Sequence, residues 1–228
     1  NLASFLKKYK NNILATTEIK NAILDSGITF IITPTPSQKN GSFSLRYINP
    51  VVKEIAQVLK LKKGYHLVVI VSTVMPQSTD NIKKILEKIS GKKCTKDFGL
   101  CYNPEFIALG SVIYNLLNPD FVLIGESDNK AGEILQRFYK KYCINKPKIS
   151  RMSFVNAELT KISLNMYITT KISYANMLAE ICEKLPGGNV DMVTEAMGLD
   201  SRVGKKYLKG GSAFGGPCFP RDNIAFIS

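Results

Sequence analysis

The sequence contains no tryptophan, a single histidine at His66, and neither a CxxC pair nor a histidine cluster. These absences exclude the ligand spacings of common zinc sites, so we expect no bound metal. They also leave only Asp, Glu, Lys and Cys side chains for acid–base chemistry. The five cysteines are odd in number and widely separated, which indicates reduced thiols and a cytoplasmic location.

The sequence also lacks a long apolar run. The longest, HLVVIV at residues 66–71, is much shorter than the roughly 20 residues of a membrane-spanning helix, so we expect no membrane contact. The chain has 228 residues, of which 45% are apolar and 21% are charged. This composition is typical of a soluble globular protein that is large enough to bury a hydrophobic core.

Acidic residues are scarce beside basic ones: 18 Asp and Glu stand against 31 Lys and Arg, which gives a formal charge of +13. A charge of this sign attracts nucleic acids and smaller anions such as diphosphates. The lysines are scattered along the chain, however, without an aromatic platform or a recognisable nucleic-acid motif. We therefore expect solvated helix faces and no nucleic-acid partner.

The sequence does contain an alternation of apolar strands and amphipathic helices. Two β-branched runs, at 28–33 and 66–71, are typical of strands buried on both faces of a parallel sheet. Further strands are predicted at 12–16, 98–102, 121–125 and 146–150, and helices at 17–27, 48–64, 78–91 and 130–142. Thr17 and Asn49 are the expected caps of the first two helices. This order predicts an α/β fold with a partial, doubly wound parallel sheet of the Rossmann type.

The pattern changes in the second half of the chain. Residues 153–185 contain neither glycine nor proline and are apolar on several faces, which predicts one long buried helix. A shorter helix is predicted at 189–198, with Gly198 at its end. We expect a Rossmann-like domain at 1–150 and a small helical domain at 151–228, joined within one compact body.

Polar segments follow three of the predicted strands: TPTPS at 33–37, STVMP at 72–76 and YNPEF at 102–106. Open α/β sheets bind ligands at the carboxyl ends of their strands. Each segment alone is better explained as an ordinary turn, but three at successive strand ends favour a shared cleft. A GxGxxG fingerprint is missing, so either the cleft is no dinucleotide site or the chain is a fragment. The amphipathic opening at residues 1–10 favours the fragment.

Glu158, Lys161 and Asn165 fall on one face of the predicted long helix because of their spacing. Lys161 and Asn165 have apolar neighbours, among which an unpaired polar group is costly. One interpretation is a snorkelling lysine and an interhelical hydrogen bond. The other is a pair of donors aimed at a developing oxyanion, and that interpretation requires a nucleophile nearby.

The segment KGGSAFGGPCFPRD at 209–222 offers such a nucleophile. Pro220 suits the first turn of a helix, so Cys218 is expected at a helix N-terminus, where the helix dipole favours the thiolate. Asp222 would lie in the first turn, as a proton acceptor for chemistry at the thiol. The glycines would let the backbone approach a ligand. A structural cysteine and a routine helix-start aspartate are the alternative.

These segments together resemble the nucleotide-sugar dehydrogenases, the family of UDP-glucose 6-dehydrogenase. The resemblance rests on GGSAFGGPCFPRD, STVMP, YNPEFIALGSVIYNLLNPDFVLIGE, NAELTKISLNMYITTKISYANMLAEICE and LDSRVGKKYLKGG, which follow the family's order over nearly the whole chain. It implies NAD-dependent oxidation of a sugar C6 alcohol to a carboxylate in two steps, through a cysteine thioester. It also implies NAD as the cofactor, a nucleotide sugar such as UDP-glucose as the substrate, and a homodimer or larger homo-oligomer formed through the long helix.

The resemblance also implies roles for individual residues at matching motif positions. Cys218 would be the nucleophile, Lys161 and Asn165 would stabilise the reacting oxygen, and Asp222 and Thr73 would handle the proton or order water. Glu105 would assist hydrolysis of the thioester. The cofactor would be bordered by Thr33, Pro34, Thr35, Pro36, Ser72, Thr73 and Arg221. The substrate would contact Glu105, Phe106, Ile107, Lys161, Asn165, Arg202, Lys209, Phe214 and Gly215, with Arg202 reaching a partner subunit's site.

The sequence departs from the family pattern at three positions: Leu109 replaces an acidic residue, Arg221 a frequent lysine and Ala213 a frequent glycine. The resemblance also places a glycine-rich cofactor loop before Asn1 and a nucleotide-binding domain after Ser228. We therefore expect little or no turnover from these residues alone. One alternative is a UDP-N-acetylhexosamine or GDP-mannose dehydrogenase, but the NPEF and Arg-Val-Gly segments argue against it. The other alternative is a non-catalytic dimerising module that binds anions.

Overall fold

A computed structural model describes residues 2–108 and 110–228, so the departure at Leu109 lies outside the described residues. Five strands form one sheet in the order β1-β2-β3-β4-β5. The strands are β1 (Ile28–Ile31), β2 (His66–Ile70), β3 (Phe98–Tyr102), β4 (Phe121–Glu126) and β5 (Lys148–Met152). All five overlap predicted strands, and the α/β class is confirmed.

The direction of β4 differs from a fully parallel sheet. β1, β2 and β3 run parallel, and so do β4 and β5, but β4 pairs antiparallel with β3. Among its described residues, the connection between β3 and β4 holds only α5 (Val112–Leu117), a short helix that has no buried residue and was not predicted. A parallel connection requires a long crossover, usually a packed helix, so the chain here re-enters the sheet in the opposite direction. The sheet is therefore mostly parallel.

The strand predicted at 12–16 is wrong. The helix α1 (Leu2–Tyr9) leads into the 3-10 turn η1 (Lys10–Asn12), and irregular backbone follows. Ile13 and Leu14 are exposed, so no sheet neighbour buries the apolar pair that suggested a strand.

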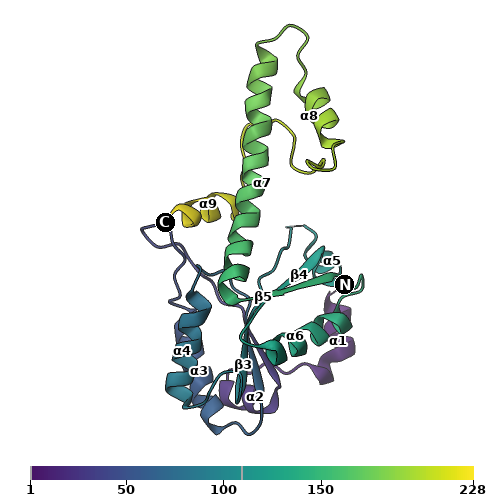
Figure 1. Ribbon diagram of the computed structural model, residues 1–228. Coiled ribbons are helices and arrows are strands. Elements are labelled where there is room, and N and C mark those ends of the chain that lie inside the picture. The colour runs from purple at the N-terminus through teal and green to yellow at the C-terminus, as the bar shows by residue number, and fades with distance from the viewer. Residues whose placement is uncertain (1, 109) are drawn as a thin grey trace.

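Helices cover both faces of the sheet (Figure 1). One face is covered by α2 (Ile19–Asp25), α3 (Ile48–Leu61) and α4 (Ser78–Ser90), and the other by α6 (Asn129–Tyr142). β2 and β3 are consequently buried at every position, which explains their uninterrupted apolar sequences. The caps predicted at Thr17 and Asn49 are wrong, because α2 begins after Glu18 and α3 after Tyr47.

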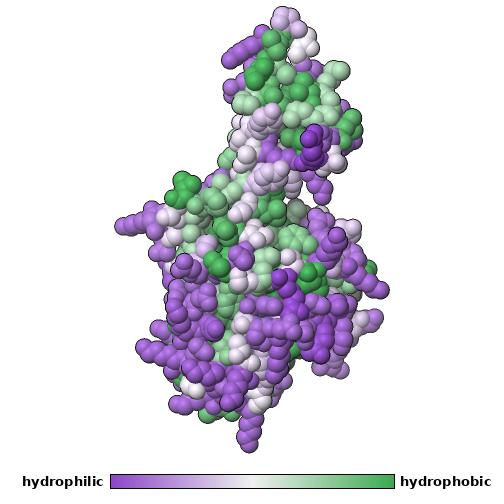
Figure 2. Space-filling model, viewed as in Figure 1, coloured by the Kyte–Doolittle hydropathy of each residue, from purple (hydrophilic) through white to green (hydrophobic). Residues whose placement is uncertain are grey.

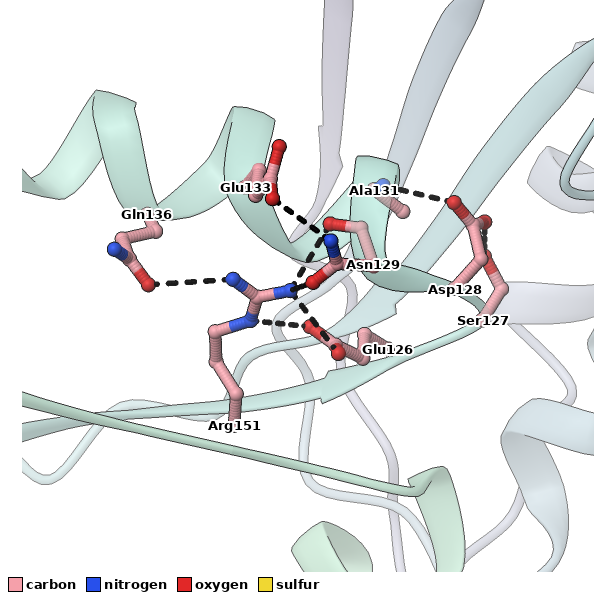
Figure 3. A network of polar contacts seen from close by, with 8 residues as sticks. All are labelled: Glu126, Ser127, Asp128, Asn129, Ala131, Glu133, Gln136 and Arg151. Atoms are coloured by element: carbon pink, nitrogen blue, oxygen red, sulfur yellow. Dashed lines mark hydrogen bonds and ion pairs between the residues drawn. The ribbon is translucent and has the colours of Figure 1, made fainter.

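A polar network ties α6 to the strands β4 and β5 (Figure 3). Arg151 of β5 donates from Nε to Glu126 of β4 at 2.6 Å, and from Nη2 to the carbonyl oxygen of Asn129 at 3.0 Å. Gly132 leaves the room for this pair, because a Cβ there would lie 1.6 Å from Oε2 of Glu126. The network fixes α6 on one face of the sheet, and Phe154 and Ala157 of the long helix join the core on the opposite face.

The long helix α7 (Phe154–Glu183) begins against the sheet and then projects beyond it (Figure 1). α8 (Val190–Gly198) packs beside the projecting part, and α9 (Phe219–Ile227) crosses α7 nearer the sheet. The helix is therefore confirmed, but its burial along the whole length is not: Tyr174 and Ile181 are exposed. Figure 2 shows apolar surface on this projecting part. The expected compact body is also wrong, because only the first half of α7 meets the sheet.

Candidate active site

Cys218 lies at the N-cap of α9, and its side chain is exposed. Pro220 lies in the first turn, and the backbone N–H of Asp222 donates to the carbonyl of Cys218 at 2.8 Å. The predicted helix start at Cys218 is therefore confirmed. Gly216, just before it, has a φ of 81°, in the left-handed region that favours glycine. This turn places the thiol at the positive end of the α9 dipole.

Asp222 points from α9 toward α7. Asp222 is buried, with only 2% of its surface exposed, and its Oδ2 accepts a hydrogen bond from Nδ2 of Asn165 at 2.6 Å. The Oδ1 atom lies 3.5 Å from Nε of Arg221 and has no hydrogen-bond partner among the described residues. Ile162 and Ala225 pack in the same interface between the two helices. One interpretation of Asn165 was an interhelical hydrogen bond, and Asn165 makes such a bond. Its partner is the carboxylate of Asp222, one turn after Cys218 on α9.

Lys161 is turned inward and does not snorkel to the solvent. Its ammonium donates to the carbonyl oxygen of Glu105 and lies 4.5 Å from the centre of the Phe106 ring. Burial lowers the pKa of Lys161, and the negative charges of its neighbours, Asp222 first and Cys218 next, partly offset that effect. In the part of the chain that the structure describes, no carboxylate lies within ion-pair distance of this ammonium. Lys161 is thus a desolvated cation on which the charges of Asp222 and Cys218 act.

The loop after β3 carries Glu105 and is held in place by hydrogen bonds of Asn103. Asn103 donates from Nδ2 to the carbonyl of Leu123 at 2.8 Å, and its Oδ1 accepts from the Tyr139 hydroxyl at 2.5 Å. Burial raises the pKa of the half-buried Glu105 carboxyl, while the charge of Lys161 lowers it. A carboxyl that holds its proton to higher pH is suited to proton exchange near neutrality.

The ends of β1 and β2 are joined by Ser72, whose hydroxyl accepts from the N–H of Thr33 at 2.9 Å and donates to its carbonyl at 2.6 Å. Arg221 reaches the same edge from α9, because its Nη1 donates to the carbonyl of Thr35 at 3.3 Å. Its guanidinium also lies 4.5 Å from the centre of the Phe43 ring. The structure therefore brings the segment 33–36, Ser72 and Arg221 together.

One residue expected at the substrate, Arg202, lies apart from this cluster. Arg202 is exposed and pairs with Asp200 at 2.6 Å. The carbonyl of the next residue, Val203, accepts a hydrogen bond from Lys171 of α7. At 1.5 Å per residue, Lys171 is about 15 Å further along the helix axis than Lys161. The role of Arg202 in a partner subunit's site stays a prediction.

Within residues 2–108 and 110–228, the other expected residues show no distinctive contact. Thr73 and Ile107 are half-buried in the loops after β2 and β3. Lys209 and Gly215 are exposed, as is Ala213, and Phe214 is half-buried. Among the described residues, no group of three or more His, Cys, Asp or Glu side chains is placed to hold a metal ion, and no helix is long and apolar enough to span a membrane.

Sequence reasoning placed Glu158 on one face with Lys161 and Asn165, but its carboxylate turns away from them to Gln77 and Thr79 at the start of α4. It also missed the anchoring of the Glu105 loop by α6. Neither contact has a local sequence signal, because the partners are far apart in the chain.

Two family models match the chain. Residues 1–143 match the NAD-binding domain of the UDP-glucose/GDP-mannose dehydrogenase family, and residues 155–228 match the family's central domain. The first of these matches points to NAD as the cofactor.

Individual relatives agree with these matches. The chain is 35% identical over 100% of its length to the UDP-glucose 6-dehydrogenase of Haloferax volcanii, of which it covers 53%. It is 36% identical over 91% of its length to the GDP-mannose 6-dehydrogenase of Pseudomonas aeruginosa, of which it covers 47%. The chain thus spans about half the length of the curated relatives that it matches.

Solved structures show the same likeness. A UDP-glucose dehydrogenase from Pyrobaculum islandicum aligns with a TM-score of 0.86 and 32% identity, over 97% of this chain and 50% of that one. A ternary complex of GDP-mannose dehydrogenase from Pseudomonas aeruginosa aligns with a TM-score of 0.80 and 32% identity, over 100% of this chain and 53% of that one. The chain therefore belongs to the UDP-glucose/GDP-mannose dehydrogenase family.

Proposed function

We propose that this chain carries the reaction centre of an NAD-dependent nucleotide-sugar 6-dehydrogenase that converts UDP-glucose to the uronate through a thioester on Cys218. The observation that carries the proposal is the crossing of α7 and α9. There Asn165 of α7 bonds to the buried carboxylate of Asp222, one turn past the exposed thiol of Cys218 on α9, and the charges of Asp222 and Cys218 both act on the desolvated ammonium of Lys161. Such a set supplies a nucleophile, an oxyanion site and a proton acceptor together.

The residues at the carboxyl edge of the sheet fit a bound NAD. The buried Oγ1 atom of Thr33 has no hydrogen-bond partner in the described residues, which leaves a polar atom free at the edge where α/β sheets bind nucleotides. Thr33, Pro34, Thr35, Pro36, Ser72, Thr73 and Arg221 would hold the cofactor there. When bound, NAD supplies the hydride acceptor for each of the two oxidations.

The chain's own groups handle the sulfur and oxygen chemistry. The Cys218 thiolate adds to the aldehyde carbon, and the new alkoxide is stabilised by Lys161 and Asn165. Loss of hydride from that carbon leaves a thioester. Glu105 then activates a water, which adds to the thioester carbon and releases the carboxylic acid and the thiol. Asp222 and Thr73 take up the proton or order the water in these steps.

The nucleotide sugar would lie between the β3 loop and the segment before Cys218. Glu105, Phe106, Ile107, Lys209, Phe214 and Gly215 would contact it, together with Arg202 of a partner subunit. We propose a homodimer or larger homo-oligomer formed through α7, because the projecting part of that helix leaves apolar side chains uncovered. We also propose that residues 1–150 form the NAD-binding domain and residues 151–228 the helical domain, and that the five free cysteines reflect a cytoplasmic location.

The proposal is tested by incubating the protein that carries this chain with NAD and UDP-glucose and counting the NADH formed per sugar. Two NADH per sugar are expected. Cys218→Ala should abolish the second oxidation while the protein stays folded, and Cys182→Ala on α7 is the matched control. A Cys218→Ala variant with full turnover would refute the assignment.

GDP-mannose and a UDP-N-acetylhexosamine form the parallel arms of this assay, because relatives acting on other nucleotide sugars match the chain as well. A higher kcat/KM with either of them would change the proposed substrate and keep the chemistry. No turnover with any of the three would favour the non-catalytic, anion-binding module.

A further inference from the structure

The carboxylate of Glu158 accepts three hydrogen bonds at the start of α4. Its Oε1 accepts from the N–H of Thr79 at 2.8 Å and from the Thr79 hydroxyl at 2.6 Å, and its Oε2 accepts from the N–H of Gln77 at 2.7 Å. The residue is 0% exposed. Within the described residues, no basic group lies at ion-pair distance from it. A fully buried carboxylate on α7 is therefore held by another helix's N-terminus.

This contact gives α4 the N-terminal cap that its own N-cap side chain does not provide. The first N–H groups of a helix have no acceptor inside the helix, and its positive end favours an anion. The N-cap residue Gln77 makes no side-chain cap, and its φ of 72° is left-handed. Such a conformation is uncommon outside glycine and persists where the surroundings impose it. Here it aims the Gln77 N–H at Glu158.

Glu158 also belongs to a circuit of hydrogen bonds and short chain segments around the candidate active site. From Glu158 the circuit passes to the loop between β2 and α4, where Ser72 bonds to Thr33 after β1. The segment after β1 accepts from α9, and α9 returns to α7 through Asp222 and Asn165. The circuit joins the loops expected to border the cofactor to both helices that carry the reacting groups.

We infer that Glu158 is a positioning residue that holds the β2–α4 loop, with Ser72 and Thr73, in register with Lys161. Lys161 lies three residues further along α7, on the same face as Glu158. The inference rests on the proposed function, in which this loop borders the cofactor and Lys161 faces the reacting oxygen. Removal of Glu158 would let the loop shift against α7, and a misplacement of about 1 Å costs on the order of 100-fold in rate.

Glu158→Gln tests this inference, because it keeps the size and turns an amide NH₂ toward groups that are themselves donors. In the protein that carries this chain, we expect kcat to fall and the KM for NAD to rise, each by about tenfold or more. The KM for UDP-glucose should stay within about twofold, because Asn103 anchors the Glu105 loop separately. Glu180→Gln, exposed on the same helix, is the matched control and should change none of these values.

A merely structural role would lower Tm and leave the ratio of the two KM values unchanged when both are measured well below Tm. That result would overturn the inference, as would an unchanged KM for NAD. If Glu158→Gln does not fold, Thr79→Val decides, since it removes one of the three donors without altering α7. A smaller change of the ratio in the same direction supports the inference, and an unchanged ratio refutes it.

Titration with NAD alone separates this inference from the proposed function. Glu158→Gln should bind NAD about tenfold more weakly than the wild type or worse, and equal dissociation constants would overturn the inference. If the wild type binds NAD but oxidises no nucleotide sugar, the proposed function fails and the titration still judges Glu158. A wild-type protein that does not bind NAD overturns the inference as well.

Discussion

The two halves of α7 share one helix and differ in what they bury. The half nearer the sheet holds a fully buried carboxylate, a half-buried ammonium and a half-buried amide, and each of the three has a partner on another element. The projecting half buries only Thr169 and Ala175 of its residues, while Tyr174, Met177 and Ile181 are 44%, 46% and 46% exposed. Apolar side chains are exposed on the near half as well, at Leu159 and Tyr167, so the two halves differ in how much they bury.

This contrast indicates two functions along the helix. Burying polar groups costs free energy unless they are bonded, so a near half that fully buries one of them, partly buries two more and bonds all three is built as a site. A contiguous apolar face left uncovered is typical of a surface that meets another protein. We propose that the near half serves chemistry and that the far half serves assembly.

The largest expected effect comes from removing the positive charge of Lys161 in the near half of α7. Lys161→Met removes the ammonium beside Cys218, and removing one oxyanion-stabilising donor costs about 10²–10³ in kcat. Lys184→Met, exposed just past the end of the same helix, should leave kcat unchanged. Steady-state NADH formation measures both. If Lys161→Met kept its kcat within about threefold, the near half would have no electrostatic role in the reaction.

The next effect concerns the pH dependence of stability and comes from His66, a buried ionisable residue of β2. Burial, together with the charge of Lys62, lowers the pKa of His66 to about 4 from its ordinary 6.5. Because the unfolded chain binds this proton first, stability falls as the pH drops from 6.5 to about 4, by about 3 kcal/mol. His66→Gln should remove that part of the pH dependence, as measured by urea unfolding at pH 7 and at pH 4. Equal pH dependence in both proteins would contradict the assignment to His66.

A smaller effect is expected in the far half. Introducing Tyr174→Lys and Ile181→Lys together adds two charges to the uncovered apolar face. We expect the dimer to dissociate with a Kd raised about 100-fold, which is about 2.7 kcal/mol, and Tm to change little at equal monomer content. Light scattering after gel filtration measures the mass. A wild type that is already monomeric would rule out assembly through α7.

The smallest effect concerns the pH dependence of activity. Burial lowers the pKa of Lys161, so the ammonium that the reaction needs is lost at lower pH than that of an exposed lysine. The alkaline limb of kcat should therefore move to higher pH in Lys161→Arg, because a guanidinium stays protonated. Full pH profiles of both proteins show the shift. An alkaline limb that is identical in the two proteins would mean that another group titrates there.

Much of the fold follows from local sequence. Strands β2 and β3 are uninterrupted apolar runs and the helix start at Cys218 has a proline in its first turn, so period and capping rules place both. The wrong strand at 12–16 and the reversed β4 have the same cause. Strand identity and direction depend on which neighbours are available to pair, and a local pattern does not contain that information.

The site divides in the same way. The spacing of Lys161 and Asn165 put both on one face, and the structure brings them to Asp222. The spacing gave Glu158 the same face, yet its carboxylate bonds to α4, because side chains one turn apart can turn to different neighbours. Burial of α7 was overestimated because its composition is apolar on several faces, whereas apolar side chains along both halves, among them Leu159, Tyr167 and Ile181, are exposed in this chain.

The central claim is that Cys218 carries the acyl group during the reaction, and Glu105→Gln tests it most directly by slowing hydrolysis of the thioester. The variant would be mixed with NAD and the nucleotide sugar that the wild type oxidises, quenched in acid and digested for mass spectrometry. We predict a uronyl adduct on the peptide that contains Cys218, absent from Cys218→Ala and from wild type after turnover is complete. Continued oxidation with the Cys218 peptide always unmodified would contradict the account.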